Sequence, residues 1–313
     1  MIEKIIGVLK NAQHILIATH MSPDGDAIGS SVAMAHLCQY YDVPYTLLLE
    51  ELPTEYAFLL EKVSISKEWE KPVDVFLSLD CGDTKRLGNY EKLFEKAKVT
   101  INIDHHVTNE GLGNYAFIQA EASSTSELVY KIIKEAGMPI TAQVAESLYT
   151  GLVTDTGGFM HSCTHSSTHL AVADLLQTPF NFTTLYYKLI HEKTEATVRL
   201  QSRAIQQLIK WGQGQIYVSY LTPENLKEEG ATREDASHIV TYLKNIKGCE
   251  VAIVIYPGKI EGEYKVSLRS NPPYDVAAIA KCLGGGGHER AAGASIIGTL
   301  EEVFIVLKDH MNF

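Results

Sequence analysis

Val99-Thr-Ile-Asn-Ile-Asp-His-His106 is an apolar, β-branched run that stops at three consecutive ionisable residues. Such a run is typical of a buried strand that ends at a polar site. Two earlier stretches end in the same way, His14-Ile-Leu-Ile-Ala-Thr-His20 and Val73-Asp-Val-Phe-Leu-Ser-Leu-Asp80. Ligands bind outside the carboxyl ends of the strands in an open parallel sheet, so we expect these three strand ends to meet in space.

Helices and strands alternate around these stretches. Apolar residues at helical spacing predict a helix over Asp26–Tyr41, and further helices and strands alternate up to Val153, which implies a parallel sheet covered on both faces. A helix-prone stretch and a second set of strands and helices follow. We therefore predict an α/β protein with an active-site cleft between two domains: a parallel-sheet domain over 1–180, a helical linker over 181–213 and a smaller α/β domain over 214–313.

Composition narrows the class of protein. The chain has 313 residues, of which 45% are hydrophobic, as in ordinary globular proteins of about two domains. We find no apolar run near the roughly 20 residues that span a bilayer and no signal-peptide pattern at the N-terminus, so we expect a cytoplasmic protein without a membrane partner. The five cysteines are scattered and form no C-x-x-C pair, which disfavours a disulfide framework and a zinc site.

The charge balance is acidic, with 38 Asp and Glu against 27 Lys and Arg and a net charge of −11. Proteins that bind long nucleic acid need a basic surface for its phosphates, so we expect no long duplex partner. Small anionic substrates remain possible, because bound divalent cations reverse the local sign of charge in a carboxylate cluster.

Four carboxylates and two imidazoles stand at the ends of predicted elements. They are His20, Asp24, Asp26, Asp80, His105 and Asp155. We expect Gly25 to let the backbone turn tightly between two of these acids. Each residue taken singly also fits a helix cap or a structural histidine. Together, however, so many like charges share one site only if cations neutralise them, which suits two octahedral divalent ions. The donors favour Mn²⁺ over Zn²⁺ or Ca²⁺ and leave Mg²⁺, Co²⁺ and Fe²⁺ open.

The motifs resemble those of the DHH phosphoesterase superfamily: His20-x-x-x-Asp24-Gly-Asp26, Leu79-Asp80, Asp104-His105-His106 and Gly151-x-x-Thr-Asp155. Arg269-Ser270 and Gly284-Gly-Gly-Gly-His288 are similar to the DHH-associated C-terminal domain. The length is most similar to the NrnA-type branch. That branch contains oligoribonucleases of very short RNA that also dephosphorylate 3′-phosphoadenosine 5′-phosphate (pAp).

The resemblance implies a role for each motif residue. His20, Asp24 and Asp80 would hold one Mn²⁺, and Asp26, Asp80, His105 and Asp155 the other, with Asp80 bridging. Asp104 would orient the neighbouring imidazole, and His106 would contact the scissile phosphate. Adjacent residues at a strand end point in different directions, which also argues that His105 and His106 are not both metal ligands.

A second phosphate site is predicted from the C-terminal motifs. Its candidate substrate-binding residues are Arg269, Ser270, Gly285, Gly286, Gly287 and His288. Glycines let backbone N–H groups approach an anion closely, and an arginine offers two parallel donors. The structural alternative is a plain flexible turn.

Other candidates are given structural interpretations. His161, His165 and His169 are spaced like one face of a helix, but the Ser and Thr residues between them indicate capping and loop roles. We expect Cys81 to be a small buried residue and not a nucleophile. For Arg86 we expect a surface ion pair, and contact with a phosphate is the alternative.

The resemblance implies a Mn²⁺-dependent phosphoesterase that hydrolyses short oligoribonucleotides to mononucleotides and pAp to AMP. The alternatives within this class are hydrolysis of a linear or cyclic dinucleotide second messenger and of inorganic pyrophosphate. A nucleotide-binding regulator on the same fold is the non-enzyme alternative, although such a regulator normally lacks a ligand residue and this chain has the full set. A homodimer is possible.

Overall fold

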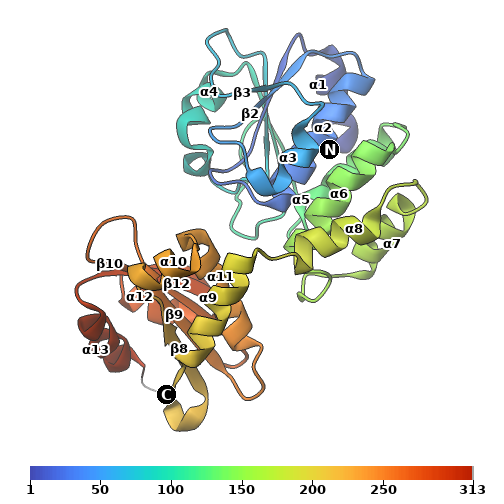
Figure 1. The fold of residues 1–313 in the computed structure, drawn as a ribbon. Helices are drawn as coiled ribbons and strands as arrows, with labels where there is room; N and C mark the ends of the chain where they lie inside the picture. The colour runs from blue at the N-terminus through green and yellow to red at the C-terminus, as the bar shows by residue number, and fades with distance from the viewer. Residues whose placement is uncertain (312–313) are drawn as a thin grey trace. The chain divides into compact units, whose positions relative to one another are not determined.

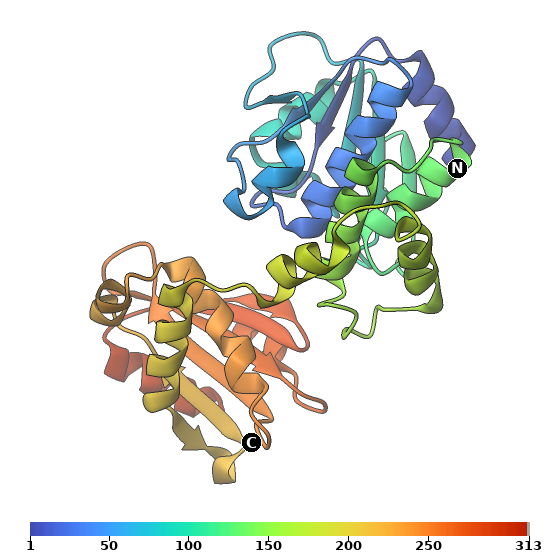
Figure 2. The same ribbon diagram turned by 45° about the vertical axis from the view of Figure 1, so that its right-hand side comes forward.

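The computed structural model describes residues 1–311, apart from the side chain of His288. The chain forms two compact units, Met1–Glu192 and Lys193–Phe313, and the stretch predicted as a linker spans the division between them (Figures 1 and 2). Each unit contains a six-stranded sheet. A parallel-sheet unit with helices, followed by a smaller α/β unit, is the predicted architecture.

The sheet of the first unit is parallel throughout, in the order β3-β2-β1-β4-β5-β6. Its strands are β1 Ile15–Ala18, β2 Tyr45–Leu48, β3 Ile65–Ser66, β4 Val75–Leu79, β5 Val99–Asp104 and β6 Tyr115–Ile118. Its helices are α1 Ile2–Asn11, α2 Gly25–Tyr40, η1 Thr54–Tyr56, α3 Ala57–Leu60, η2 Thr84–Tyr90, α4 Glu91–Lys96, α5 Thr125–Glu135, α6 Ala142–Asp155, α7 Ser166–Leu175, α8 Phe182–Tyr186 and η3 Tyr187–His191.

Both faces of this sheet are buried, which explains the continuous apolar strands. Ile15 and Ile17 of β1 belong to the core formed with α1, α2, α5 and α6. Leu16, between them, belongs to the core on the other face, where Phe76 packs edge-on against Phe94 of α4 at 5.4 Å between ring centroids. Successive strand residues point to opposite faces, so a strand covered on both sides has no polar alternation.

The strand order reverses at the centre of the sheet. β1 pairs with β2 on one side and with β4 on the other, and both pairings are parallel. The chain therefore turns in opposite directions after β1 and after β4, and this reversal opens a crevice at their carboxyl ends. His20 and Asp80 follow these two strands.

The second unit has a mixed sheet in the order β11-β12-β10-β9-β8-β7, in which only β8 and β9 are parallel neighbours among the described strands. The strands are β7 Ile209–Trp211, β8 Ile216–Tyr220, β9 Val251–Pro257, β10 Glu263–Ser270, β11 Gly286–His288 and β12 Ala291–Ile297. The helices are α9 Glu195–Gln206, η4 Gly212–Gly214, α10 Pro223–Glu229, α11 Arg233–Lys244, α12 Val276–Cys282 and α13 Leu300–His310.

Two parts of this unit differ from what the sequence indicates. Residues 209–211 lie in the predicted helical linker but form a short edge strand. The glycine run, for which a plain turn is the structural alternative to a phosphate site, contains another edge strand. β11 pairs with β12 through Gly286 opposite Gly293 and Gly287 opposite Ala292. Glycines and short, exposed segments carry no apolar period, so only the neighbouring strand reveals them.

Two expectations from composition can be examined in the structure. Among residues 1–311, none of the helices has the length and apolar character that crossing a bilayer requires. All five cysteines are free, and Cys81 is buried as expected.

Candidate active site

The loop after β1 supplies His20 and Asp24. His20 is buried, and its Nδ1 lies 2.9 Å from the carbonyl oxygen of Met21. A carbonyl only accepts, so Nδ1 carries the proton and Nε2 faces Asp80 Oδ2 at 3.5 Å. Asp24 caps α2, since its Oδ1 accepts the N–H groups of Asp26 and Ala27, each at 3.0 Å. Within residues 1–311 its second oxygen accepts no hydrogen bond, so capping leaves it available as a ligand.

Asp26 is enclosed in the first turn of α2, with 1% of its surface exposed. Its two oxygens accept the N–H groups of Thr125 and Ser126 at the start of α5, at 2.7 and 2.8 Å. Burial, followed by the charges of Asp80 and Asp155, raises the pKa of Asp26 well above its ordinary value. The N-terminus of α5 thus partly stabilises the negative charge of Asp26, which lies among other acids.

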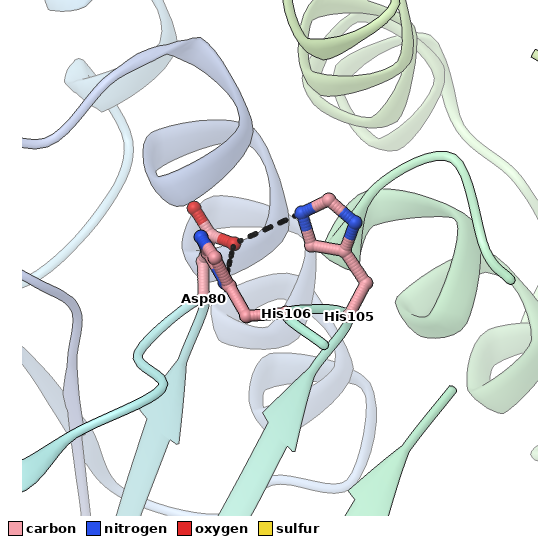
Figure 3. A group of neighbouring side chains, drawn as sticks. All are labelled: Asp80, His105 and His106. Atoms are coloured by element: carbon pink, nitrogen blue, oxygen red, sulfur yellow. Dashed lines mark ion pairs between the residues drawn. The ribbon is translucent and has the colours of Figure 1, made fainter. Parts of the chain in front are cut away.

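Asp80 lies at the centre of the site, directly after β4. It is 3% exposed and has a left-handed backbone with φ of 54°, a conformation that Asp tolerates better than most residues. Its Oδ1 accepts the Thr125 hydroxyl at 3.0 Å and lies 3.6 Å from His105 Nε2 and 3.7 Å from His106 Nδ1 (Figure 3). Burial favours the neutral form, but the contact with His20 and the charges of His106 and His105 hold the pKa of Asp80 below its ordinary value.

His105, directly after β5, and Asp155, at the end of α6, face each other. His105 Nδ1 lies 3.3 Å from the Ala122 carbonyl oxygen, so Nε2 points toward Asp155 Oδ2 at 3.3 Å. Burial raises the pKa of Asp155 to about 7; the charge of His105 opposes this and that of Asp80 adds to it. The pair therefore offers one nitrogen and one oxygen, with His105 facing Oδ1 of Asp80 whereas His20 faces Oδ2.

His106 is held differently from the other two histidines. Its Nδ1 lies 2.7 Å from Oδ1 of Asp104, which is fully buried. The hydrogen bond with Asp104 raises the pKa of His106 in spite of burial. Burial acts to raise the pKa of Asp104, yet the bonds from His106 and Asn109 keep it low. Asp104 therefore orients the ring of His106, whereas it meets His105 only at the backbone N–H, at 2.9 Å.

The donor set fits divalent cations. Within residues 1–311, three groups each place their ligand atoms within 4.8 Å of one another: His20, Asp24 and Asp80; Asp26, His105 and Asp155; and Asp80, His105 and His106. Nε2 of His20 and of His105 lies 3.3–3.6 Å from carboxylate oxygens, which is longer than the roughly 2.7–3.2 Å of an ordinary hydrogen bond. Both rings give their other N–H to a carbonyl, as metal-binding histidines do.

The structure thus brings together all six predicted metal ligands, together with His106 and Asp104. It also corrects the role of Gly25, which is not among the residues with positive φ. Gly25 begins α2, and a Cβ there would lie 2.5 Å from the Thr154 side chain. Its lack of a side chain serves close packing against α6, so the expected tight turn between the acids is wrong.

Sequence reasoning missed Thr125, Ser126 and Asn109. The first two bond Asp26 and Asp80, and Asn109 bonds Asp104. The run of Ser and Thr before α5 signalled only a helix start. Nothing in the local sequence shows that this helix start covers Asp26, 99 positions earlier, and Asp80, 45 positions earlier.

The C-terminal candidates lie in the second unit. Arg269 of β10 is half-buried, and its Nη1 donates to the Leu268 carbonyl oxygen at 2.9 Å. Burial lowers the pKa of Arg269, and no carboxylate pairs with it among the described residues. Ser270 is buried and donates to the Tyr274 carbonyl oxygen at 2.6 Å. Gly285 precedes β11, which contains Gly286 and Gly287, and the His288 side chain lies outside the described part of the chain.

The other singled-out side chains do not extend the metal site. His161 Nδ1 lies 3.0 Å from the Asp155 carbonyl oxygen, His165 precedes α7, and His169 packs on Phe159. None of these three histidines joins a metal-ligand group in residues 1–311. In the same range Arg86 forms no ion pair, so the expectation of a surface ion pair is wrong. The charge of Arg86 instead acts to lower the pKa of His106.

Comparisons with known proteins agree on the kind of chain this is. Residues 14–152 match the family model for the DHH family, N-terminal domain, and residues 213–311 match the DHHA1 domain. The bifunctional oligoribonuclease and PAP phosphatase NrnA of Thermus thermophilus is 30% identical, over 91% of this chain and 84% of the relative. The Bacillus subtilis protein of the same name is 27% identical, over 90% and 89%. The crystal structure of an exopolyphosphatase-related protein from Bacteroides fragilis superposes with a TM-score of 0.91 at 26% identity, over 99% and 94%.

Proposed function

Because this chain belongs to the DHH family, we propose that it is a phosphoesterase that hydrolyses short oligoribonucleotides to mononucleotides and pAp to AMP. Its similarity to the two NrnA proteins, which extends over nine-tenths of the chain, supports these substrates. The cofactor we propose is a pair of divalent ions, with Mn²⁺ as the first choice. His20, Asp24 and Asp80 would hold one ion, and Asp26, Asp80, His105 and Asp155 the other.

The observation that carries the proposal is the crowding of acids at one sheet edge. Asp26 and Asp80 are buried, and the charges of Asp80 and Asp155 help to raise the pKa of Asp26. A phosphate ester would add further negative charge to this place. Two divalent ions bound there would neutralise both partners and polarise the phosphorus–oxygen bonds.

The protein's own contribution to the reaction centres on His106. Asp104 is held ionised and accepts the Nδ1 proton, which leaves Nε2 as the atom that reaches substrate. The raised pKa of His106 keeps a larger fraction of the ring protonated near neutral pH. A protonated Nε2 donates to a phosphate oxygen and opposes the charge that develops there.

The second unit would hold the remote end of the substrate. Arg269 has no carboxylate partner among the described residues, so its fork is available for a phosphate. Backbone N–H groups of Gly285–Gly287 and the imidazole of His288 complete the proposed grip, with Ser270 supporting it. The interdomain cleft, the cytoplasmic location and the homodimer stay predictions.

A substrate panel tests this function. Purified protein with Mn²⁺ is offered pAp, di- to pentaribonucleotides, a 24-mer RNA, linear and cyclic dinucleotides and pyrophosphate, and released mononucleotide and phosphate are measured. We expect turnover of pAp and of the shortest RNAs, with rates that fall as length rises because of the acidic charge balance. Preferred hydrolysis of a cyclic dinucleotide or of pyrophosphate would replace the proposed substrate, and binding without turnover would indicate a regulator.

A further inference from the structure

A chain of hydrogen-bonded polar side chains joins Ser78 of β4 to Asn102 of β5 and continues through Asn109 to Asp104. Asn102 of β5 is fully buried, and its Nδ2 donates to Ser78 Oγ at 2.9 Å and to the Cys81 carbonyl oxygen at 3.1 Å. Its Oδ1 accepts Nδ2 of Asn109 at 2.8 Å. Buried amide groups are stable in a protein only when their donors and acceptors form hydrogen bonds. Here both the amino group and the carbonyl oxygen of the Asn102 side chain form them.

Asn109 is the link between this chain and Asp104. Its Nδ2 also donates to Asp104 Oδ2 at 2.6 Å, and its Oδ1 accepts the N–H of Gly111 at 2.9 Å. The orientation of the amide follows from its partners, since a carboxylate can only accept and a backbone N–H can only donate. Asn109 therefore presents its NH₂ group to Asp104.

Asp104 divides its two oxygens between different partners. Oδ1 receives the His106 ring and the His105 N–H, whereas Oδ2 receives the side chain of Asn109, and a backbone N–H of His106 also bonds the carboxylate. Removing the amide would take its short 2.6 Å side-chain hydrogen bond from a buried carboxylate, which is costly. The carboxylate would then rotate toward other donors, and the His106 ring would lose its fixed acceptor.

We propose that Asn109 is a positioning residue for His106: by anchoring Asp104, it holds the His106 ring in one orientation and one tautomer. Asn109 touches none of the six proposed metal ligands through its side chain. Replacing Asn109 should therefore change the reaction at the phosphate and leave metal binding unchanged. This role rests on the proposed function, since it requires His106 to act on the phosphate.

A matched control comes from the same loop. Asn114 also lies between β5 and β6, and its Oδ1 accepts the N–H and the hydroxyl of Thr100 at 2.8 and 3.0 Å. It anchors the loop to β5 but does not contact Asp104. Asn114→Ala thus removes a loop anchor of similar kind, and a purely structural role for Asn109 predicts the same result for both variants.

The kinetic test compares Asn109→Ala, Asn109→Leu and Asn114→Ala on whichever phosphoester the panel shows to be hydrolysed. Leu keeps most of the bulk of Asn without its donors. We expect kcat to fall about 10- to 100-fold in both Asn109 variants, as for partners behind catalytic groups, while KM and Mn²⁺ affinity stay within about twofold of wild type. Asn114→Ala should keep kcat within about twofold of wild type. Equal losses for Asn114→Ala, or full activity of Asn109→Leu, would overturn the proposal.

A spectroscopic arm separates this inference from the substrate proposal. At a pH high enough to leave the ring neutral, ring ¹⁵N signals of histidine-labelled, Mg²⁺-loaded protein report the tautomer of His106, which a His106→Gln spectrum assigns. We expect one tautomer with the proton on Nδ1 in wild type and in Asn114→Ala, and a mixture in Asn109→Ala. An unchanged His106 signal in Asn109→Ala overturns the positioning role even if no phosphoester is hydrolysed. A wild type that hydrolyses none of the panel contradicts the proposed function instead.

Discussion

Asp80 combines an unusual backbone with an unusual set of neighbours. Its φ of 54° places it in the left-handed region, and its oxygens lie 3.5–3.7 Å from three histidine nitrogens. Residues with strained backbones concentrate at functional sites because the surroundings hold them there. At Asp80 the Thr125 hydroxyl and His20 supply that restraint.

Asp80→Asn should abolish most activity while the protein stays folded. The amide keeps the shape and the tolerance of left-handed backbone but removes the charge that both ions would share, so we expect kcat to fall at least about 100-fold. Asp80→Ala should fold less stably, by about 1 kcal/mol, since alanine is disfavoured in this conformation. Steady-state kinetics in Mn²⁺ and thermal unfolding measure the two effects. A well-folded Asp80→Asn protein with full activity would contradict the two-ion model.

His106 and Arg269 should fail in different ways. A group that acts in the transition state lowers kcat when it is removed, whereas one that binds a remote phosphate raises KM. We expect His106→Ala chiefly to lower kcat. Arg269→Ala should chiefly raise KM for pAp, by about 10- to 150-fold for the loss of a charge-assisted hydrogen bond. A small chromogenic phosphodiester has no second phosphate, so equal KM losses on both substrates for Arg269→Ala would contradict the remote grip.

At the scale of elements, the site depends on the close contact between α2 and α6. A Cβ at Gly29 of α2 would lie 2.3 Å from the Ser147 carbonyl oxygen of α6. A Cβ at Gly151 of α6 would lie 2.0 Å from Ser126 Oγ and 2.6 Å from Asp26 Oδ1. Three glycines, counting Gly25, thus let the two helices carry Asp26 and Asp155 to the same place.

Gly29→Ala should destabilise the protein although alanine favours helices. The new methyl group meets backbone that cannot move aside cheaply, so we expect a loss of about 1–3 kcal/mol in the free energy of unfolding. Gly7 of α1 is the matched control, because a Cβ there meets nothing within 4 Å. Gly7→Ala should raise stability by about 0.5–1 kcal/mol. Denaturant unfolding of both variants decides the point, and a neutral Gly29→Ala would show that the helices separate easily.

At the scale of the whole molecule, a strongly acidic chain keeps four carboxylates at one sheet edge. Its net charge is −11, and the pKa of Asp155 is raised from 3.8 to about 7 by burial and by neighbouring acids. Between these two values the folded chain binds more protons than the unfolded chain. Stability of the metal-free protein therefore falls as pH rises across this window.

Mn²⁺ should stabilise the protein more at pH 8 than at pH 5. Metal ions replace the protons that the acids otherwise bind, so their benefit is largest where no proton remains. The measurement is the difference in Tm between Mn²⁺-loaded and chelator-treated protein at the two pH values. Asp155→Asn is the control and should reduce the pH dependence of the metal-free protein, because the amide does not titrate. An equal gain in Tm at both pH values would argue against a metal site built from these acids.

The sequence by itself determined the strands and the chemistry at their ends. Three apolar, β-branched runs are followed by His20, Asp80 and Asp104. Strand geometry and burial constrain each residue of a strand locally, so the residue pattern itself shows them. Alternation of helices and strands was enough to place those ends at one edge of a parallel sheet, where the structure has them.

Only the tertiary structure decided which groups surround these ends. The start of α5 covers Asp26, 99 positions earlier in the chain, and Asp80, 45 positions earlier. Likewise, β11 forms because β12 lies beside it. The proposed role of Asn109 depends on its hydrogen bonds to both Asn102 and Asp104. Hydrogen-bond partners of this kind are set by packing between distant segments, and a local pattern of residues contains no record of them.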